Sequence, residues 1–275
     1  MSEIKAADVS KLRNMTGAGM MDCKKALVEA NGDFEAATDI IRKRGQALAN
    51  KRADREASQG VVLAKTNADA TKGTMIVLNC ETDFVAKNVD FVNFAKTILD
   101  LAIEKSPANL DELKALQING RTIADQVNDQ TGKIGEKIDL SFFDFISANQ
   151  VNVYIHQGNL IATMVGLNKV VDPQVSRDVA MQAAAMYPIA IDKDDVPQKV
   201  IDKELEIGKE QARQEGKPEE MLEKIAIGKL NKFYKDSTLL NQDFVKDSKM
   251  TVKQYLQSID KDLTVTVFKY YSLKQ

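Results

Sequence analysis

The hydrophobic period changes along this chain, and that change limits the folds open to it. Through the first 45 residues, apolar side chains recur at helical spacing, as at Val9, Leu12 and Met15. From Gly60 onward, short runs rich in β-branched residues replace this pattern. A helical period predicts amphipathic helices, whereas short β-rich runs between turn residues predict strands. We therefore expect an α+β protein in which a helical unit precedes a region of mixed helix and sheet.

Three short helices are predicted in the first 45 residues. The first ends at Gly17 and the second spans about Gly19–Ala30, while Asp33 caps a third that ends at Gly45. Glycine favours the left-handed conformation that ends a helix, and aspartate is a good N-cap. A unit this small has a thin core. The Lys- and Arg-rich stretch 46–58 contains no proline and is expected to form a helical connector.

Two stretches, 60–104 and 151–186, show the order hairpin, then helix. This repetition predicts two related α+β halves with antiparallel sheets. The predicted strands are Gly60–Lys65, Thr74–Cys80, Ile138–Phe145, Val151–His156, Leu160–Leu167 and Leu263–Tyr271. The predicted helices are Asp83–Glu104, Leu110–Leu116, Ile123–Gln130, Gln174–Met186 and Val252–Ser258. The last strand is expected to rejoin a sheet.

A helical hairpin is predicted to project from this core. Two charged helices, over Gln198–Glu215 and Glu219–Tyr234, flank a turn of three residues that ends in Pro218. A turn this short predicts antiparallel packing. Their apolar residues are too sparse to bury much inside one domain, which favours a protruding arm. The expected domains are 1–55 for the helical unit, 56–195 with 236–275 for the core, and 196–235 for the arm.

Composition and charge favour a binding protein over an enzyme. With 44% hydrophobic and 28% charged residues, the chain is typical of a soluble globular protein. No apolar run approaches the roughly 20 residues needed to span a bilayer, and the polar first residues do not resemble a signal peptide. We therefore expect a cytoplasmic location and no membrane contact. The net charge of −2 argues against a nucleic-acid binder.

Residues typical of catalytic and metal sites are scarce. Cys23 and Cys80 lie far apart, and His156 is the only histidine. The chain contains no GxSxG, HExxH, GxxxxGK[ST] or GxGxxG motif. We therefore expect no catalytic residue, no metal site and no cofactor. An RNA-binding or ribosome-binding module stays open as an alternative, because basic residues are concentrated between positions 42 and 55, although a solvated helix face is the favoured explanation for them.

Three blocks of sequence, in order, resemble the bacterial elongation factor Ts family. The first joins Leu12-Arg13 to the run Thr16–Leu27 and to Asn31-Gly32-Asp33. The second is Thr82-Asp83-Phe84-Val85-Ala86-Lys87, directly after a predicted strand. The third is Gly216-Lys217-Pro218 with Lys232-Phe233 beyond it. Together they span nearly the whole chain.

This resemblance implies a UBA-like three-helix domain, a two-part α+β core with antiparallel sheets, and an inserted helical hairpin forming a coiled-coil arm. It also implies guanine-nucleotide exchange on elongation factor Tu during translation elongation, without catalysis and without direct contact with the nucleotide. It allows a homodimer within a heterotetramer. Some family members continue with a further helical module, whereas this sequence reaches Gln275 soon after its last predicted strand, which leaves that module's partner contact open.

The same resemblance assigns roles to particular residues. Thr82, Asp83, Phe84 and Val85 are implied to dislodge Mg²⁺ from the partner GTPase. Contact residues are expected at Leu12, Arg13, Met20, Met21 and His156. An exchange factor must bind the nucleotide-free GTPase better than the GDP-bound form, and linkage then weakens GDP binding.

Each assignment has a structural alternative. Thr82 is also a good helix N-cap, and Asp83 suits the first turn of a helix. Phe84 falls on one stripe of the predicted helix with Phe91 and Ala95, which would make it a core residue. Of two adjacent methionines on a helix, one is expected to point inward and the other outward.

Overall fold

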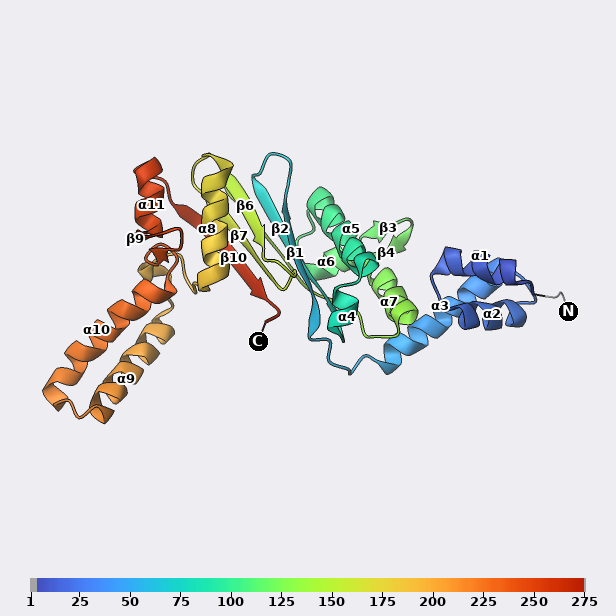
Figure 1. The fold of residues 1–275 in the computed structure, drawn as a ribbon, viewed down its shortest axis with the longest axis horizontal. Coiled ribbons are helices and arrows are strands. Elements are labelled where there is room, and N and C mark those ends of the chain that lie inside the picture. The colour runs from blue at the N-terminus through green and yellow to red at the C-terminus, as the bar shows by residue number, and fades with distance from the viewer. Residues whose placement is uncertain (1–3, 275) are drawn as a thin grey trace.

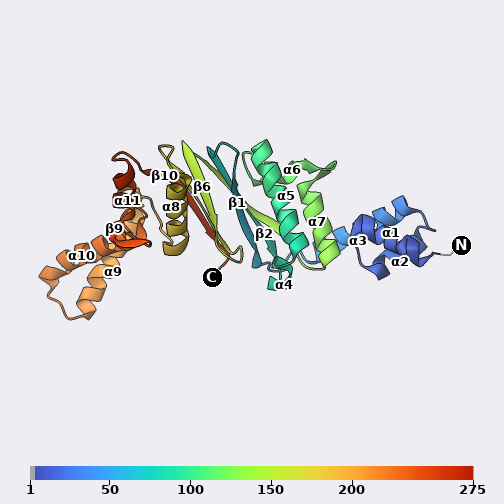
Figure 2. The ribbon, with the colours of Figure 1, turned by 45° about the horizontal axis from the view of Figure 1, so that its top comes forward.

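The computed structural model describes residues 4–274, which form an elongated molecule (Figure 1). Three helices lie at one end, two sheets with their covering helices lie in the middle, and a helical hairpin projects from the other end. A second view gives the same order of parts (Figure 2). The α+β class predicted from the change of period is confirmed.

The N-terminal unit consists of α1 (Ala6–Thr16), α2 (Met20–Glu29) and α3 (Phe34–Lys51). Gly17 ends α1 in the left-handed conformation with φ 70°. The carboxylate of Asp33 caps α3 by accepting hydrogen bonds from the N–H groups of Glu35 and Ala36. A small core closes the unit, made of Val9, Leu12, Ala18, Cys23, Ala26, Leu27 and Ala37.

The predicted end of the third helix at Gly45 is wrong, because α3 continues to Lys51. A glycine inside a helix costs about 1 kcal/mol relative to alanine but does not stop the helix. Here Gly45 faces Gly132 of α7 (Ile123–Ile134), and a Cβ placed on Gly132 would lie 2.5 Å from the Cα of Gly45. The two helix backbones therefore touch where side chains would keep them apart.

Two three-stranded antiparallel sheets form the core. The first has the order β1-β2-β5, and the second has the order β10-β7-β6. Their strands are β1 (Gln59–Thr66), β2 (Lys72–Cys80), β5 (Asp139–Ser147), β6 (Gln150–Ile155), β7 (Ile161–Leu167) and β10 (Val265–Ser272). The last strand rejoins the second sheet beside β7, as predicted, with Phe268 opposite Val165.

The two sheets share one apolar layer, and helices cover their other faces. The shared layer includes Val62 and Val77 from the first sheet and Ala162 and Met164 from the second. The helices α5 (Val89–Lys105), α6 (Leu110–Ala115) and α7 pack on the first sheet, and α8 (Pro173–Met186) with α11 (Val252–Ile259) cover the second. Each sheet thus has covering helices of its own, and the relatedness of the two halves stays a prediction.

The long helix predicted over Asp83–Glu104 is two helices, α4 (Asp83–Ala86) and α5. The side chain of Asn88 separates them, because its Oδ1 accepts hydrogen bonds from the N–H groups of Asp90 and Phe91 at 2.8 and 3.3 Å. Asparagine is a strong N-cap, and here it begins a new helix in a different direction. Phe84 and Phe91 consequently do not share a helical stripe.

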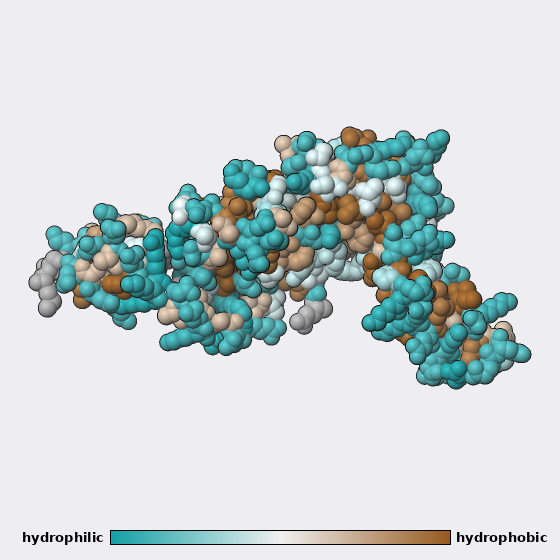
Figure 3. Space-filling model, turned by 180° about the vertical axis from the view of Figure 1, so that it is seen from behind, coloured by the Kyte–Doolittle hydropathy of each residue, from teal (hydrophilic) through white to brown (hydrophobic). Residues whose placement is uncertain are grey.

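The predicted hairpin is formed by α9 (Gln198–Gln214) and α10 (Glu219–Ser237), which pack chiefly on each other. Their seam buries small and apolar residues: Gly208, Ala212, Leu222, Ala226 and Leu230. From behind, the hairpin shows apolar residues along its middle between hydrophilic edges (Figure 3). Within residues 4–274, no helix has both the length and the apolar character to cross a membrane.

Five short elements have no counterpart among the sequence predictions. They are β3 (Gln117–Ile118), β4 (Arg121–Thr122), the 3₁₀ turn Lys193–Asp195, β8 (Asp243–Phe244) and β9 (Asp247–Thr251). Elements of two to five residues are too short to show a hydrophobic period.

Candidate partner-binding site

One carboxylate binds the residue that begins the short helix α4. Thr82 is its N-cap, and the side chain of Glu136 accepts hydrogen bonds from the Thr82 N–H at 3.0 Å and from its hydroxyl at 2.7 Å. The Thr82 hydroxyl oxygen also lies 3.5 Å from the Val85 N–H. Because both polar hydrogens of Thr82 are bound, residues 82–85, which we name the α4 tip, are fixed at their start.

A second carboxylate secures the residue before the tip. Glu81 accepts hydrogen bonds from the Lys137 N–H and the Arg52 guanidinium, both at 2.6 Å, while Arg55 lies 3.4 Å away. The Lys137 amide, and after it Arg52, holds the pKa of Glu81 below its usual range. Burial raises the pKa of the neighbouring Cys80 thiol to about 12, so this thiol stays protonated and unreactive near neutral pH.

The α4 tip presents an aromatic ring beside a carboxylate. Phe84 is 83% exposed, whereas Ala86 is buried and Val85 packs against the core. The Asp83 carboxylate accepts a hydrogen bond from the Lys87 ammonium at 2.6 Å, which lowers the pKa of Asp83. A largely exposed phenyl ring on an anchored turn is available to a partner. Thr82 and Val85 hold the tip from within.

The N-terminal unit places its predicted contact residues differently. Arg13 is exposed, and Met20 and Met21 are 43% and 63% exposed. The expectation that one methionine points inward is wrong, because both are exposed and the residue of this part of α2 that enters the core is Cys23. Met15 is a further exposed methionine of this unit, at 59%.

Leu12 does not belong to this surface. Its side chain is fully buried in the core of the N-terminal unit, where α1 packs on α2. The prediction that Leu12 contacts a partner is therefore wrong, because no part of this side chain reaches the surface. Leu12 instead stabilises the helix that carries the exposed Arg13.

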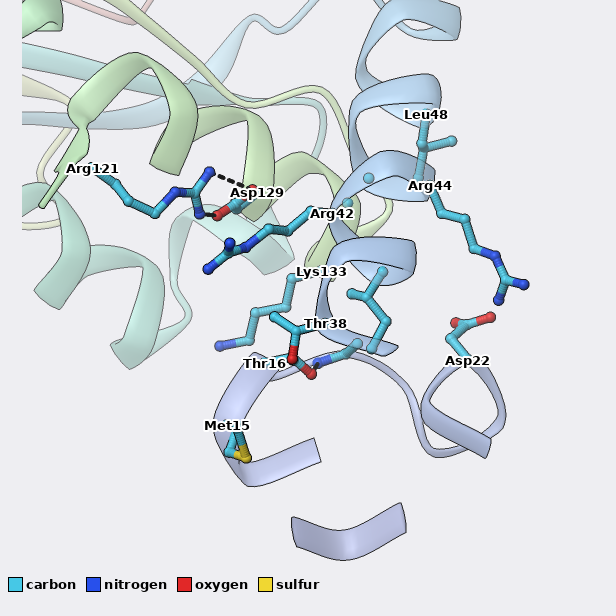
Figure 4. A pocket seen from close by; sticks show the side chains of 14 residues that line it. Met15, Thr16, Asp22, Thr38, Arg42, Arg44, Leu48, Arg121, Asp129 and Lys133 are labelled. Atoms are coloured by element: carbon cyan, nitrogen blue, oxygen red, sulfur yellow. Dashed lines mark hydrogen bonds and ion pairs between the residues drawn. The ribbon is translucent and has the colours of Figure 1, made fainter. Parts of the chain in front are cut away.

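One groove joins the N-terminal unit to the α4 region. Its floor is α7, and its lining includes Gly17 from the N-terminal unit, Val85 and Asn88 beside the tip, and Lys133 between them. Lys133 also lines a neighbouring cavity of about 290 Å³ between α3 and α7. Figure 4 shows that cavity, with the Arg121–Asp129 ion pair at one side. The two predicted motifs, at residues 12–27 and 82–87, thus border two depressions that share Lys133 in their linings.

His156 lies elsewhere, at the turn after β6 in the second half of the core. It is exposed, and its Nδ1 lies 3.2 Å from the Tyr154 hydroxyl. The groove lining does not include it. Its predicted partner contact would be separate from the surface formed by the α4 tip and the N-terminal unit.

The arginines of the basic stretch are paired with carboxylates. Arg44 binds Glu29 at 2.6 Å, Arg42 lies 3.7 Å from Asp39, and Arg52 and Arg55 bind the Glu81 side chain. A phosphate backbone would have to compete with these pairs. The pairing favours a structural role for this stretch over an RNA-binding one. Among residues 4–274, no group of three or more His, Cys, Asp or Glu side chains is arranged to hold a metal ion.

Glu136, Lys137 and Lys133 take part in the site but carry no sequence signal. Glu136 and Lys137 bind partners 54 and 56 residues away in the chain. Periodicity and local motifs describe neighbours within a few positions, so they cannot predict such pairings. Only the topology that brings the end of α7 beside the end of β2 makes these contacts.

Comparison with known proteins gives one consistent result. A sequence model of the family described as "Elongation factor TS" matches residues 81–275. The elongation factor Ts of Cytophaga hutchinsonii is 53% identical, over 99% of this chain and 100% of its own. Those of Porphyromonas gingivalis and Christiangramia forsetii are 52% and 50% identical, covering 97% and 99% of this chain and 97% and 100% of theirs.

Proposed function

The chain belongs to the elongation factor Ts family, and from that membership we propose that it is a guanine-nucleotide exchange factor for elongation factor Tu in translation elongation. It binds the GDP-bound GTPase and promotes GDP release so that GTP can enter. The observation that carries this proposal is the anchored α4 tip, with Phe84 83% exposed. The protein acts by binding and catalyses no chemical step.

The mechanism follows from linkage between two binding equilibria. A factor that binds the nucleotide-free GTPase more tightly than the GDP form must weaken GDP binding by the same ratio. In GTPases, Mg²⁺ neutralises the phosphate charge and is held by protein side chains. We assign to Phe84 and Asp83 the displacement of those supports, so that the Mg²⁺ and the phosphates are loosened. Thr82 and Val85 hold the tip during this step.

The magnitude requires a second contact. Burying one phenylalanine side chain contributes about 1.5–3 kcal/mol, and each tenfold change in release rate requires about 1.4 kcal/mol. The α4 tip alone would therefore supply one to two orders of magnitude. We assign the remaining binding to the exposed Arg13, Met20 and Met21 of the N-terminal unit. Methionine adapts to irregular surfaces, and arginine pairs with carboxylates.

A GDP-release assay at two Mg²⁺ levels tests the proposal. Elongation factor Tu is loaded with fluorescent GDP and mixed with the protein and excess unlabelled GDP. We expect strong acceleration in millimolar Mg²⁺ and a much smaller acceleration in excess EDTA, because EDTA removes the metal beforehand. No acceleration in either buffer would overturn the exchange function. Equal acceleration in both would leave exchange standing and refute the Mg²⁺ step.

A further inference from the structure

The end of α7 contacts both the N-terminal unit and the residues that begin α4. We name Gly132–Lys137 the coupling segment. On the side of the N-terminal unit, a Cβ on Gly132 would lie 2.5 Å from the Cα of Gly45. One residue on, the Cε of Lys133 lies 2.6 Å from where a Cβ on Gly17 would be. α3 and the loop after α1 therefore rest directly on α7.

The other end of the coupling segment binds the connector and the α4 tip. The Lys137 ammonium donates hydrogen bonds to the backbone carbonyls of Ala53 and Arg55 at 2.6 and 2.9 Å. The Lys137 N–H binds Glu81, and the Glu136 carboxylate binds Thr82 twice. These bonds join the chain that leaves α3 to the residues that begin α4.

A glycine in the left-handed conformation lets the coupling segment contact α3 on one side and the start of α4 on the other. Gly135, with φ 83°, ends α7, and its N–H donates to the Thr131 carbonyl. The chain then leaves the helix direction, so Glu136 and Lys137 project toward the end of β2 while Gly132 still faces α3. A helix continued through these positions would turn their side chains around its axis by about 100° per residue, away from Glu81 and Thr82.

We propose that the coupling segment is a positioning element, which fixes the N-terminal unit relative to the α4 tip so that the two act as one rigid surface. This inference rests on the proposed function. Two contacts held at a fixed spacing bind as one bivalent surface, and rigidity lowers the entropy lost on association. No residue of the segment needs to touch the partner for this effect. The Gly45–Gly132 crossing sets the spacing.

Two alanine substitutions at the same crossing separate this role from a general effect on stability. In Gly132→Ala the new Cβ meets the Gly45 backbone at 2.5 Å, so α3 must move. In Gly45→Ala the new Cβ meets the Gly132 Cα at 3.5 Å, an ordinary contact, so the displacement is smaller. Gly228→Ala in α10 is the matched control, because nothing lies within 4 Å of its Cβ. All three changes raise helix propensity equally.

The first readout is the distance between the N-terminal unit and the core. Spin labels are placed at Val28→Cys on α2 and at Val170→Cys after β7, both on exposed side chains, while Cys23 and Cys80 are buried. We expect Gly132→Ala to shift or broaden the pulsed-EPR distance distribution. Gly228→Ala is expected to reproduce the parent distribution. An unchanged distribution in Gly132→Ala would overturn the proposal.

The second readout is GDP release from elongation factor Tu as a function of factor concentration, without the labels. We expect Gly132→Ala to raise the half-saturating concentration by at least about tenfold, because the bivalent advantage is lost. The maximal rate should stay near the parent's, because the α4 tip is unchanged. If Gly132→Ala shifts the EPR distance but keeps the parent's half-saturating concentration, the coupling is also refuted.

A further variant guards against misfolding. If Gly132→Ala loses its helical circular dichroism, Lys137→Met serves instead, since it removes the two bonds to the connector carbonyls and keeps the Lys137 N–H on Glu81. The same shift and the same rise in half-saturation are expected, and their absence contradicts the proposal. If the parent protein does not accelerate GDP release from elongation factor Tu, the proposed function fails. The EPR distances alone then decide whether the coupling segment fixes the N-terminal unit relative to the core.

Discussion

The substitution Phe84→Ala tests whether Phe84 faces the partner or belongs to the core. Phe91, seven positions later, provides a matched comparison. Phe84 is 83% exposed, whereas Phe91 on α5 is 2% exposed. Removing a buried phenyl ring costs about 3–5 kcal/mol of folding stability. A surface substitution usually changes stability by no more than about 0.5 kcal/mol. We therefore expect Phe84→Ala to keep the parent's urea midpoint and Phe91→Ala to lower it strongly.

The expected slowing of GDP release in Phe84→Ala follows from the area of the Phe84 side chain that is exposed in the free protein and becomes buried on binding. Full burial of the side chain contributes about 1.5–3 kcal/mol, and scaling by its exposed fraction leaves about 1.2–2.5 kcal/mol. At about 1.4 kcal/mol per tenfold change in rate, GDP release should slow by about 7- to 60-fold. In the proposed mechanism the ring is exposed before binding and buried when release occurs.

Unfolding and GDP release are measured on the same sample, so that activity is expressed per folded molecule. Val170→Ala is the surface control, because Val170 is 77% exposed and lies outside the groove. It is expected to match the parent in both measurements. If Phe84→Ala releases GDP at the parent's rate, the ring is not the displacing group. If it unfolds as early as Phe91→Ala, the ring is a core residue.

Three other predictions follow from the domain arrangement and the anchors. Replacing residues 198–234 by a short Gly-Ser link should leave the core folded, because α9 and α10 pack chiefly on each other; loss of β-sheet circular dichroism would refute this. A chain beginning at Gly60 should fold but bind elongation factor Tu much more weakly, and undiminished heat in titration calorimetry would exclude the N-terminal contacts. The Lys137 amide and Arg52 lower the folded-state pKa of Glu81, so its contribution to stability is complete above the unfolded pKa of about 4.3 and is lost as pH falls through the folded value. Glu81→Gln should therefore show a smaller loss of stability on acidification below about pH 5 than the parent, and identical acid unfolding curves would contradict the anchor.

Local sequence chemistry predicted most elements of the fold. Gly17 ends α1 and Asp33 caps α3 as expected, because both effects depend only on a residue and its immediate backbone. The strands and most helix boundaries followed from period and turn residues for the same reason. Local rules failed at Gly45 and Asn88. The first was expected to stop a helix and does not, and the second interrupts one that was expected to continue.

Family resemblance identified the residues of the α4 tip as a candidate site, whereas the tertiary structure showed which of them are exposed. The helical stripe by itself favoured a core position for Phe84 and the resemblance favoured a partner contact, and in the structure a break at Asn88 separates Phe84 from that stripe and leaves it exposed. Leu12 and the adjacent methionines show the same limit. A helical period indicates which residues share a face, but the size of the core decides how many of them it covers.

The anchors of the site depended entirely on tertiary structure. Glu136 and Lys137 meet Thr82 and Glu81 across more than 50 residues of chain, and Gly132 meets Gly45 across an interface between two units. The sequence by itself determined the local conformations, since these are set by backbone sterics, capping and hydrophobic period within a few residues. Tertiary structure alone decided which distant side chains meet and which ones stay exposed, because those outcomes depend on how the elements pack together.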